Sequence, residues 1–191
     1  MRLFVAVELA EAAREAAGSV VQELRTRLDP RVSARWVNVD KMHLTVRFIG
    51  QVDDERAVEV LDALRPPLPI AAFDIAFGDC GVFPRSGPPR VLWIGLKDGR
   101  PSLEMMHDEF NRRLLPLGLA PENRAFSAHL TLARVKDAPR DAVRTLRTMV
   151  AAVHVPSPRC QVTAATVFRS SLSPQGSTYT RLLTVPCNIE V

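Results

Sequence analysis

Two copies of the motif His-x-Thr hold the residues of this chain that are best suited to chemistry. They lie at His43 to Thr45 and His129 to Thr131, and they contain two of the four histidines. Apolar and polar residues alternate around each copy, which is typical of a half-buried β-strand. Alternation puts the imidazole and the hydroxyl of one motif on the same strand face, about 7 Å apart. We therefore expect each motif to present both side chains at the surface of a sheet.

Two imidazoles that flank one small site suit acid-base catalysis. Histidine can accept or donate a proton near neutral pH, so one ring can deprotonate a nucleophile while the other protonates a leaving group. A threonine hydroxyl on each side can donate to two oxygens of a tetrahedral oxyanion, which favours phosphorus over a planar carbonyl. We predict that His43 and His129 face each other across a cleft. Their nearest nitrogens should be about 5 to 8 Å apart, as two hydrogen bonds to one phosphate require.

Other catalytic arrangements have less support in the sequence. A zinc site normally needs three or four ligands, and no Asp, Glu or Cys lies at ligand spacing in either His-x-Thr segment. Nothing resembles a nucleophile elbow, a Cys-His signature or a glycine-rich phosphate loop. We therefore expect no metal and no cofactor. The remaining alternative is a duplicated scaffold whose histidines only face solvent, although an idle duplication need not keep the same motif in both halves.

Length and composition indicate a folded, mildly basic protein. The 191 residues are 47% hydrophobic, enough for one compact domain or two small lobes with a shared core. A net charge of +4 favours a polyanionic partner such as nucleic acid. Cys80, Cys160 and Cys187 are odd in number and widely spaced, which argues against a disulfide framework. The first apolar run is too short for a signal peptide, and no stretch reaches the length of a membrane span. We expect a cytoplasmic monomer.

The pattern of elements repeats after residue 90. The first half predicts strands at 2–8, 43–50 and 70–83 and helices at 11–28 and 53–64. The second half predicts strands at 91–96, 126–135 and 161–168 and helices at 102–115 and 140–150. The segment 84–90 reads as a loop, and a terminal hairpin arm at 178–186 follows a turn at 173–176.

The two halves match element for element, so the fold class follows from the repeat. His43 comes 40 positions after Leu3 in the first strand, and His129 comes 38 positions after Val91. We predict an α+β fold of two pseudo-symmetric β-α-β-α-β lobes, whose mainly antiparallel sheets face each other across a central cleft. Residues 1–191 would form a single bilobal domain, with a first repeat at about 1–83 and a second at about 90–187.

Several segments resemble one known family. They are HLTVRFIG (43–50), HLTLARV (129–135), RLFVAVEL (2–9), FPR (83–85), PRVLWIG (89–95) and a late Ser-x-x-x-x-Gly-x-x-Tyr (171–179). Together they resemble the bacterial and archaeal RNA 2',3'-cyclic phosphodiesterases, which are two-histidine phosphoesterases and of which some are known as 2'-5' RNA ligases. The resemblance implies a metal-free enzyme that opens a terminal 2',3'-cyclic phosphate of RNA to a 2'-phosphate. Ala128 departs from the family, in which a proline commonly precedes the second motif.

The resemblance also implies roles for individual residues. It makes His43 the proton donor and His129 the proton acceptor, with RNA ends or cyclic nucleotides as substrates. Strict alternation would turn Arg134 toward the core, where an unpaired arginine is costly, so we expect a bulge that frees it to reach the phosphate. Further substrate-binding candidates are Arg47, on the histidine face by alternation, and three aromatic residues that could stack on a base: Trp36, Phe83 and Tyr179.

Two other functions remain open at this point. The chain could be an RNA- or nucleotide-binding module without significant catalysis, although both motifs keep their histidine and threonine. It could also be a reversible 2'-5' RNA ligase, because ligation uses the same groups in the reverse direction. His107, in a helix, and His154, before Val155-Pro156, are interpreted as structural or surface residues.

Overall fold

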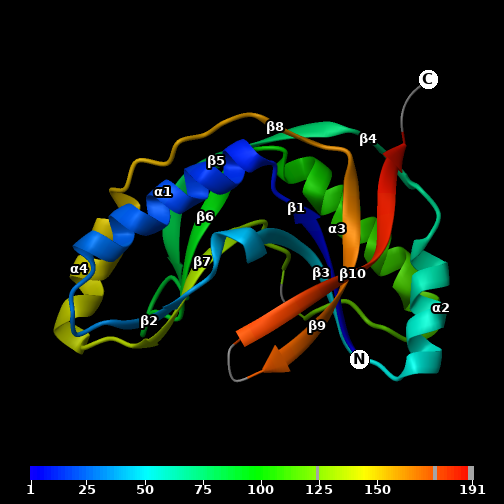
Figure 1. The fold of residues 1–191 in the computed structure, drawn as a ribbon, viewed down its shortest axis with the longest axis horizontal. Coiled ribbons are helices and arrows are strands. Elements are labelled where there is room, and N and C mark those ends of the chain that lie inside the picture. The colour runs from blue at the N-terminus through cyan, green and yellow to red at the C-terminus, as the bar shows by residue number, and fades with distance from the viewer. Residues whose placement is uncertain (124, 174–175, 189–191) are drawn as a thin grey trace.

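The computed structural model describes residues 1–123, 125–173 and 176–188 (Figure 1). Strands and helices follow one another as β1 (Arg2–Glu8), α1 (Glu11–Arg27), β2 (Ser33–Trp36), η1 (Val39–Lys41), β3 (His43–Gln51), α2 (Asp54–Leu64), β4 (Leu68–Ala71), β5 (Phe73–Phe83), β6 (Val91–Asp98), α3 (Arg100–Leu114), η2 (Leu115–Leu117), β7 (Leu130–Asp137), α4 (Arg140–Ala151), β8 (Cys160–Val162), β9 (Ala164–Ser173) and β10 (Gly176–Asn188). Here η denotes a 3-10 helix. None of the described helices is long and apolar enough to cross a membrane.

The strands form one continuous hydrogen-bonded sheet that joins the two halves of the sequence. Its order is β4-β10-β9-β1-β3-β7-β6-β5-β8, and β2 pairs with β7 off this path. Neighbouring strands are antiparallel except β4 and β10, which are parallel. The halves meet where β3 pairs with β7, so the two His-x-Thr segments lie at the centre of the molecule. The predicted α+β fold of two repeats with mainly antiparallel sheets is confirmed.

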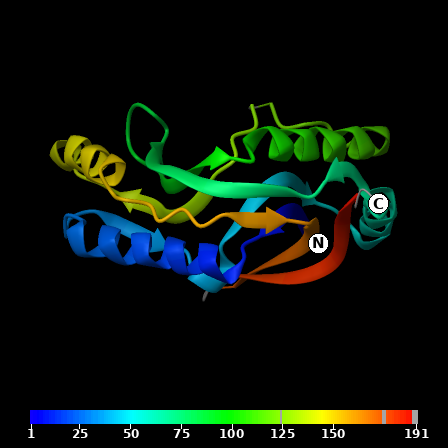
Figure 2. The same ribbon diagram turned by 90° about the horizontal axis from the view of Figure 1, so that it is seen from above.

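Each half of the sequence gives one of its later strands to the sheet of the other half. β5 follows α2 in the first repeat but pairs with β6 and β8 of the second. β9, from the second repeat, pairs with β1 of the first. Helices of the two halves also contact each other, because α1 lies beside α4 and α2 beside α3 (Figure 1). Figure 2 shows α1 and α3 on opposite sides of the strands. Each half therefore completes the fold of the other.

Helix positions follow the sequence signals closely. Asp53 caps α2, where its side chain accepts a hydrogen bond from the backbone N–H of Arg56 at 2.8 Å. The predicted core face of α3, at helical spacing, is buried: Leu103, Met106, Phe110 and Leu114. Gly118 ends η2 with a φ of 71°, a left-handed conformation that suits glycine.

Strand boundaries differ from the sequence prediction in three places. The predicted strand at 70–83 is two strands, β4 and β5, and the strand at 161–168 is likewise β8 followed by β9. The second motif strand begins at Leu130, so His129 lies immediately before β7 and not inside the predicted strand at 126–135. β9 and β10 form the predicted hairpin arm, and residues 174–175 of its predicted turn lie outside the described residues.

Candidate active site

The two motifs cross where Leu44 pairs with Leu130. Because the pairing is antiparallel, each histidine lies across from the threonine of the other motif. The two leucines are 1% and 0% exposed and point into the core, whereas the four motif side chains are half-buried on the opposite face. His43 in β3 and His129, immediately before β7, are therefore diagonal neighbours, and the Cα atoms of such neighbours are about 7 to 8 Å apart. The distance between the two imidazole nitrogens stays a prediction.

Both imidazoles are held by the same kind of hydrogen bond. Nδ1 of His43 donates to the carbonyl of Lys41 at 2.9 Å, and Nδ1 of His129 donates to the carbonyl of Ser127 at 2.7 Å. A carbonyl oxygen can only accept, so Nδ1 carries the hydrogen in both neutral rings. Nε2 is then the nitrogen that takes up or gives up the catalytic proton. The repeat thus preserves ring orientation as well as residue type.

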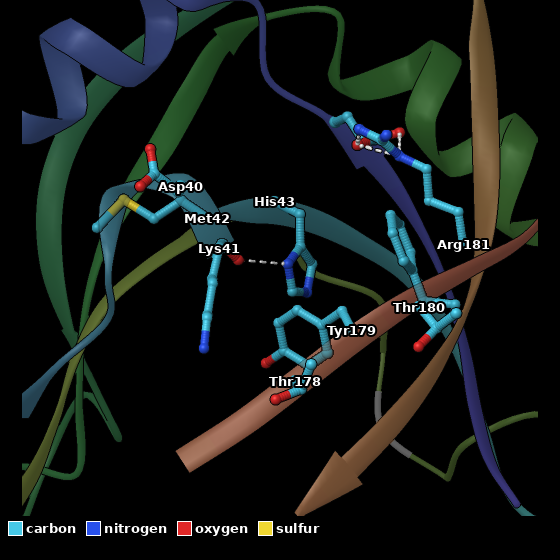
Figure 3. A pocket seen from close by; sticks show the side chains of 10 residues that line it. Asp40, Lys41, Met42, His43, Thr178, Tyr179, Thr180 and Arg181 are labelled. Carbon is cyan, nitrogen blue, oxygen red and sulfur yellow. Dashed lines mark hydrogen bonds and ion pairs between the residues drawn. The ribbon is translucent and has the colours of Figure 1, made fainter. Parts of the chain in front are cut away.

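Aromatic rings fix the position of His43. The Phe4 ring stacks on the imidazole, with centroids 4.9 Å apart and planes inclined at 29°. The Tyr179 ring meets the imidazole edge-on, at 5.2 Å and 87°, and Figure 3 shows it directly beside the histidine. Phe168 stacks on Phe4 from the adjacent strand β9. The first histidine is therefore packed between rings from β1 and β10.

The second histidine has a corresponding aromatic neighbour. The Phe83 ring meets the His129 imidazole edge-on at 5.1 Å and 86° and stacks on Trp93 at 4.8 Å. Gly81 and Gly95 leave room for the indole, because a Cβ at Gly81 would lie 2.2 Å from it. Phe83 and Tyr179 thus both lie within the site, each against one imidazole. Stacking on a base remains a prediction for both.

The electrostatic surroundings of His43 are set by β1 and β10. Burial lowers the pKa of His43 from its ordinary value, while the Lys41 carbonyl and the negative charge of Glu8 act in the opposite direction. Glu8 lies across from His43 in the sheet and pairs with Arg181, whose Nε is 3.0 Å from a carboxylate oxygen. Thr166 also donates to Glu8 at 3.0 Å. A carboxylate that is paired with an arginine therefore borders the first histidine.

A pocket of about 470 Å³ opens beside His43 (Figure 3). Its lining is Glu8, Asp40, Lys41, Met42, His43, Phe168, Thr178, Tyr179, Thr180 and Arg181. His129 is not among these residues, so the pocket covers only the half of the site formed by β1, β3 and the arm. Lys41 fixes one edge of it, because its Nζ donates to the Ser177 carbonyl in the arm at 2.9 Å.

The two threonine hydroxyls complete the site. Thr45 and Thr131 are half-buried beside the histidines, and neither hydroxyl has a hydrogen-bond partner within the described part of the chain. A hydroxyl in that position can donate to an incoming oxyanion. Residues 1–123, 125–173 and 176–188 contain no group of three or more His, Cys, Asp or Glu side chains that could hold a metal ion. The donors gathered here suit a phosphate.

A bulge follows each motif, as the sequence suggested for Arg134. The register between β6 and β7 shifts so that Leu132 is skipped, and Leu132 and Ala133 are both buried. Arg134 consequently returns to the histidine face and is exposed. The predicted bulge is confirmed. Its consequence is that an arginine follows Thr131 on the site face.

The corresponding bulge in β3 contradicts the expectation for Arg47. Val46 and Arg47 are both buried, and Arg47 is only 3% exposed. Its guanidinium donates to the carbonyls of Phe48, Leu119 and Ala120, the last two in the segment that leads toward the second motif. Alternation failed because the extra residue turns Arg47 away from the histidine face. Arg47 anchors that segment and does not face the site.

Trp36 also lies away from the site. It pairs across from the buried Ala133, and its ring packs against the core under the guanidinium of Arg25 from α1, 5.2 Å from the centroid. The prediction of base stacking is therefore wrong for this residue. His107 is structural, as expected: it is buried, and its Nδ1 donates to the Val46 carbonyl at 2.7 Å.

Comparison with known proteins agrees with this geometry. The family model described as LigT like Phosphoesterase matches residues 7–93 and 94–179, one copy for each His-x-Thr motif. The chain belongs to the LigT-like phosphoesterase family. The family predicted from the sequence motifs is thereby confirmed.

Three proteins similar to this LigT-like phosphoesterase cover 81% to 100% of its length. An RNA 2',3'-cyclic phosphodiesterase of Aeropyrum pernix is 35% identical over 160 residues, which are 81% of this chain and 86% of the relative. The crystal structure of TT0787 from Thermus thermophilus superposes with a TM-score of 0.79 at 26% identity and covers 100% of both chains. Escherichia coli LigT complexed with 3'-AMP gives a TM-score of 0.70 at 26% identity, covering 97% of both.

Three residues that shape the LigT-like site were missed in the sequence. Phe4 and Glu8 come from β1, and Trp93 comes from β6. They lie in the segments 2–9 and 89–95, but no local pattern assigns them to the site, because their places beside the motifs depend on the order of strands in the sheet. Only the spacing Trp93-x-Gly95 gives a partial signal, since a glycine two residues away on a strand lies on the same face.

Proposed function

We propose that this chain hydrolyses the 2',3'-cyclic phosphate at the end of an RNA to a 2'-phosphate, with His43 and His129 as the acid-base pair and without a metal ion. The observation that carries the proposal is the antiparallel crossing of the two His-x-Thr motifs at Leu44 and Leu130. The names of the relatives support the substrate class, because several are RNA 2',3'-cyclic phosphodiesterases.

In the proposed reaction, His129 removes a proton from water and the water oxygen attacks phosphorus opposite the ribose O3'. The bond from phosphorus to O3' breaks, and His43 gives its proton to O3', so the phosphate stays on O2'. Thr45 and Thr131 donate to the two non-bridging oxygens, where negative charge develops. Arg134 is exposed on the same face and adds a positive charge near the phosphate.

The roles of the two histidines have to be reconciled with the lowered pKa of His43. Burial favours the neutral ring in the unliganded protein. A bound phosphate carries negative charge and favours the protonated ring, so substrate binding itself would prepare His43 to act as the acid. Glu8 works in the same direction.

Substitutions at Glu8 and Arg181 should move the pH dependence in opposite directions. An acid must carry its proton, so the rate falls as pH rises past the pKa of His43. Glu8→Gln removes a charge that raises this pKa and should shift the alkaline limb of kcat/KM to lower pH. Arg181→Gln leaves the Glu8 charge unbalanced and should shift the limb to higher pH. The measurement is kcat/KM between pH 5 and 9.

Arg159→Gln serves as the control for that pair. Arg159, just before β8, forms an exposed ion pair with Asp74 of β5, 3.6 Å apart, and both strands are remote from His43 in the sheet order. The Arg159→Gln substitution should leave the acid and alkaline limbs of the kcat/KM profile unchanged. Shifts of the same sign for Glu8→Gln and Arg181→Gln would count against His43 as the acid.

Metal independence is tested by turnover in a chelator. The rate on RNA ending in a 2',3'-cyclic phosphate should agree within about twofold in excess EDTA and in buffers with added magnesium, manganese or zinc, because histidines alone move the protons. Loss of turnover in EDTA that one ion restores would overturn this part of the proposal. Absence of turnover in every buffer, together with tight RNA binding, would instead favour a binding module.

We also propose that residues 1–191 act as one bilobal domain, in the monomeric state and in the cytoplasm. Support for one domain comes from the exchange of β5 and β9, because each half needs a strand of the other to complete its sheet. The three cysteines are buried and unpaired, which suits a reducing compartment.

A further inference from the structure

Three cations follow the second motif on the histidine face of the sheet. Arg134 and Lys136 are two residues apart on β7, about 7 Å along the strand, and Arg35 lies across from Arg134 on β2. All three are exposed. Val135 and Ala34, next to these cations, pack against the core, which places Arg134 and Arg35 on the opposite face. Lys136 is skipped where the β2–β7 register shifts, and it is exposed together with Asp137, which lies across from the exposed Ser33. We call Arg35, Arg134 and Lys136 the basic strip.

The basic strip begins at the proposed catalytic site. In the register between β6 and β7, Trp93 lies across from Thr131 and Val91 across from Arg134. Since the residue skipped by the bulge is buried, Thr131 and Arg134 are consecutive on the site face. A chain bound at the threonines and continuing along β7 would meet Arg134 first and then Lys136 and Arg35.

None of the three cations forms an ion pair or hydrogen bond with another described residue. Many other arginines of the described chain are paired with carboxylates, among them Arg31, Arg56 and Arg181. Cations without partners gather loosely held counterions, and a polyanion gains free energy by releasing them. The strip is therefore suited to successive phosphates.

The first half of the site has no equivalent strip. Counting from the two histidines, Phe48 holds the position of Arg134, and Gly50 holds that of Lys136. Phe48 is 42% exposed and lies 6.3 Å from Phe4, next to the rings around His43. Rings border both motifs, since Phe83 and Trp93 lie beside His129, but only the second motif continues into cations along its strand. An RNA end has the same asymmetry, with one terminal base and a chain of phosphates.

We propose that the RNA backbone 5' of the terminal nucleotide lies along the basic strip, so that the preferred substrates are oligonucleotides and not cyclic mononucleotides. This inference rests on the proposed function. The hairpin arm borders the strip at β2, because Arg35 lies against Gly176 of β10. A Cβ atom at Gly176 would lie 2.9 Å from a guanidinium nitrogen of Arg35. Arg35 therefore stands where the strip meets the arm.

The double variant Arg35→Gln/Lys136→Gln tests the strip while leaving Arg134 and the motifs intact. For a decanucleotide ending in a 2',3'-cyclic phosphate, kcat/KM should fall about tenfold or more at low salt, whereas kcat/KM for a cyclic mononucleotide should stay within about twofold. The slope of log kcat/KM against log salt should become shallower by about 1.4, which corresponds to two lost phosphate contacts on a single strand.

Arg140→Gln/Arg144→Gln is the matched control, because it removes the same charge from exposed positions on α4. The inference would be overturned if kcat/KM fell equally in both double variants, if it fell equally on both substrates, or if it did not fall on the decanucleotide. Fluorescence anisotropy with a decanucleotide that ends in a 2'-phosphate supplies a second readout. If the strip binds RNA, the salt slope of the binding constant is shallower for Arg35→Gln/Lys136→Gln than for the wild type. This holds even if the wild-type protein turns over neither substrate, a result that would refute the proposed function but not the strip.

Discussion

Replacement of either catalytic histidine by alanine should lower kcat about 100- to 10,000-fold, which is the usual contribution of a positioned acid or base. The structural reason is that His43 and His129 lie diagonally across the pairing of β3 with β7, with both rings held by the same kind of hydrogen bond. The double variant should cost little more than the worse single one, since two groups that move protons in one step act as a unit. Single-turnover rates on a cyclic-phosphate oligonucleotide measure this directly.

His43→Asn and His129→Asn provide the matched control for packing. Asparagine can still donate to the main-chain carbonyls of Lys41 or Ser127 but cannot titrate near neutral pH. Both variants should fold with near wild-type melting temperatures and remain as inactive as the alanine variants. The acid-base pair would be contradicted if His129→Ala kept near wild-type activity. It would also be contradicted if the loss of kcat in the double variant equalled the product of the losses in the two single variants.

The second large effect is expected at the two threonines. Thr45→Val and Thr131→Val keep side-chain shape but remove the donor, so each should raise the barrier by about 2 to 4 kcal/mol, a loss of roughly 30- to 1000-fold in kcat. KM should change less, because charge on the non-bridging oxygens grows in the transition state. Steady-state kinetics on the same oligonucleotide separate kcat from KM.

Serine variants distinguish a donor from a packing role. Thr45→Ser and Thr131→Ser keep the hydroxyl and lose a methyl group, so most of the activity should return. Valine variants as active as the wild type would show that the threonines only pack. Serine variants as poor as the valine variants would show that the methyl group matters more than the hydroxyl.

Local patterns predicted the parts of this molecule that local physics controls. The His-x-Thr repeat predicted two equivalent strands because alternation fixes which side chains share a face. Asp53 marked the start of α2 through its capping hydrogen bond, and the spacing of Leu103 and Phe110 marked the buried face of α3. The burial cost of an arginine was enough to predict the bulge before Arg134.

Errors arose where the answer depends on distant pairing. Alternation predicts Arg47 on the histidine face, yet the same kind of bulge buries it, and three carbonyls accept hydrogen bonds from its two terminal guanidinium nitrogens. Trp36 is predicted to stack on a base because it is aromatic, but the pairing of β2 with β7, which turns it to the core, has no local signal. The exchange of β5 and β9 and the presence of Glu8 beside His43 likewise follow from the strand order, which no single segment encodes.

The position of the phosphate in the product tests the central proposal most directly. An oligonucleotide ending in a 2',3'-cyclic phosphate, incubated with the protein in EDTA, should give a product with its phosphate on O2' and a free 3' hydroxyl, as read by phosphorus NMR. The His43→Asn/His129→Asn variant should leave the cyclic phosphate intact. A 3'-phosphate product, or equal turnover by the double variant, would contradict protonation of O3' by the paired histidines.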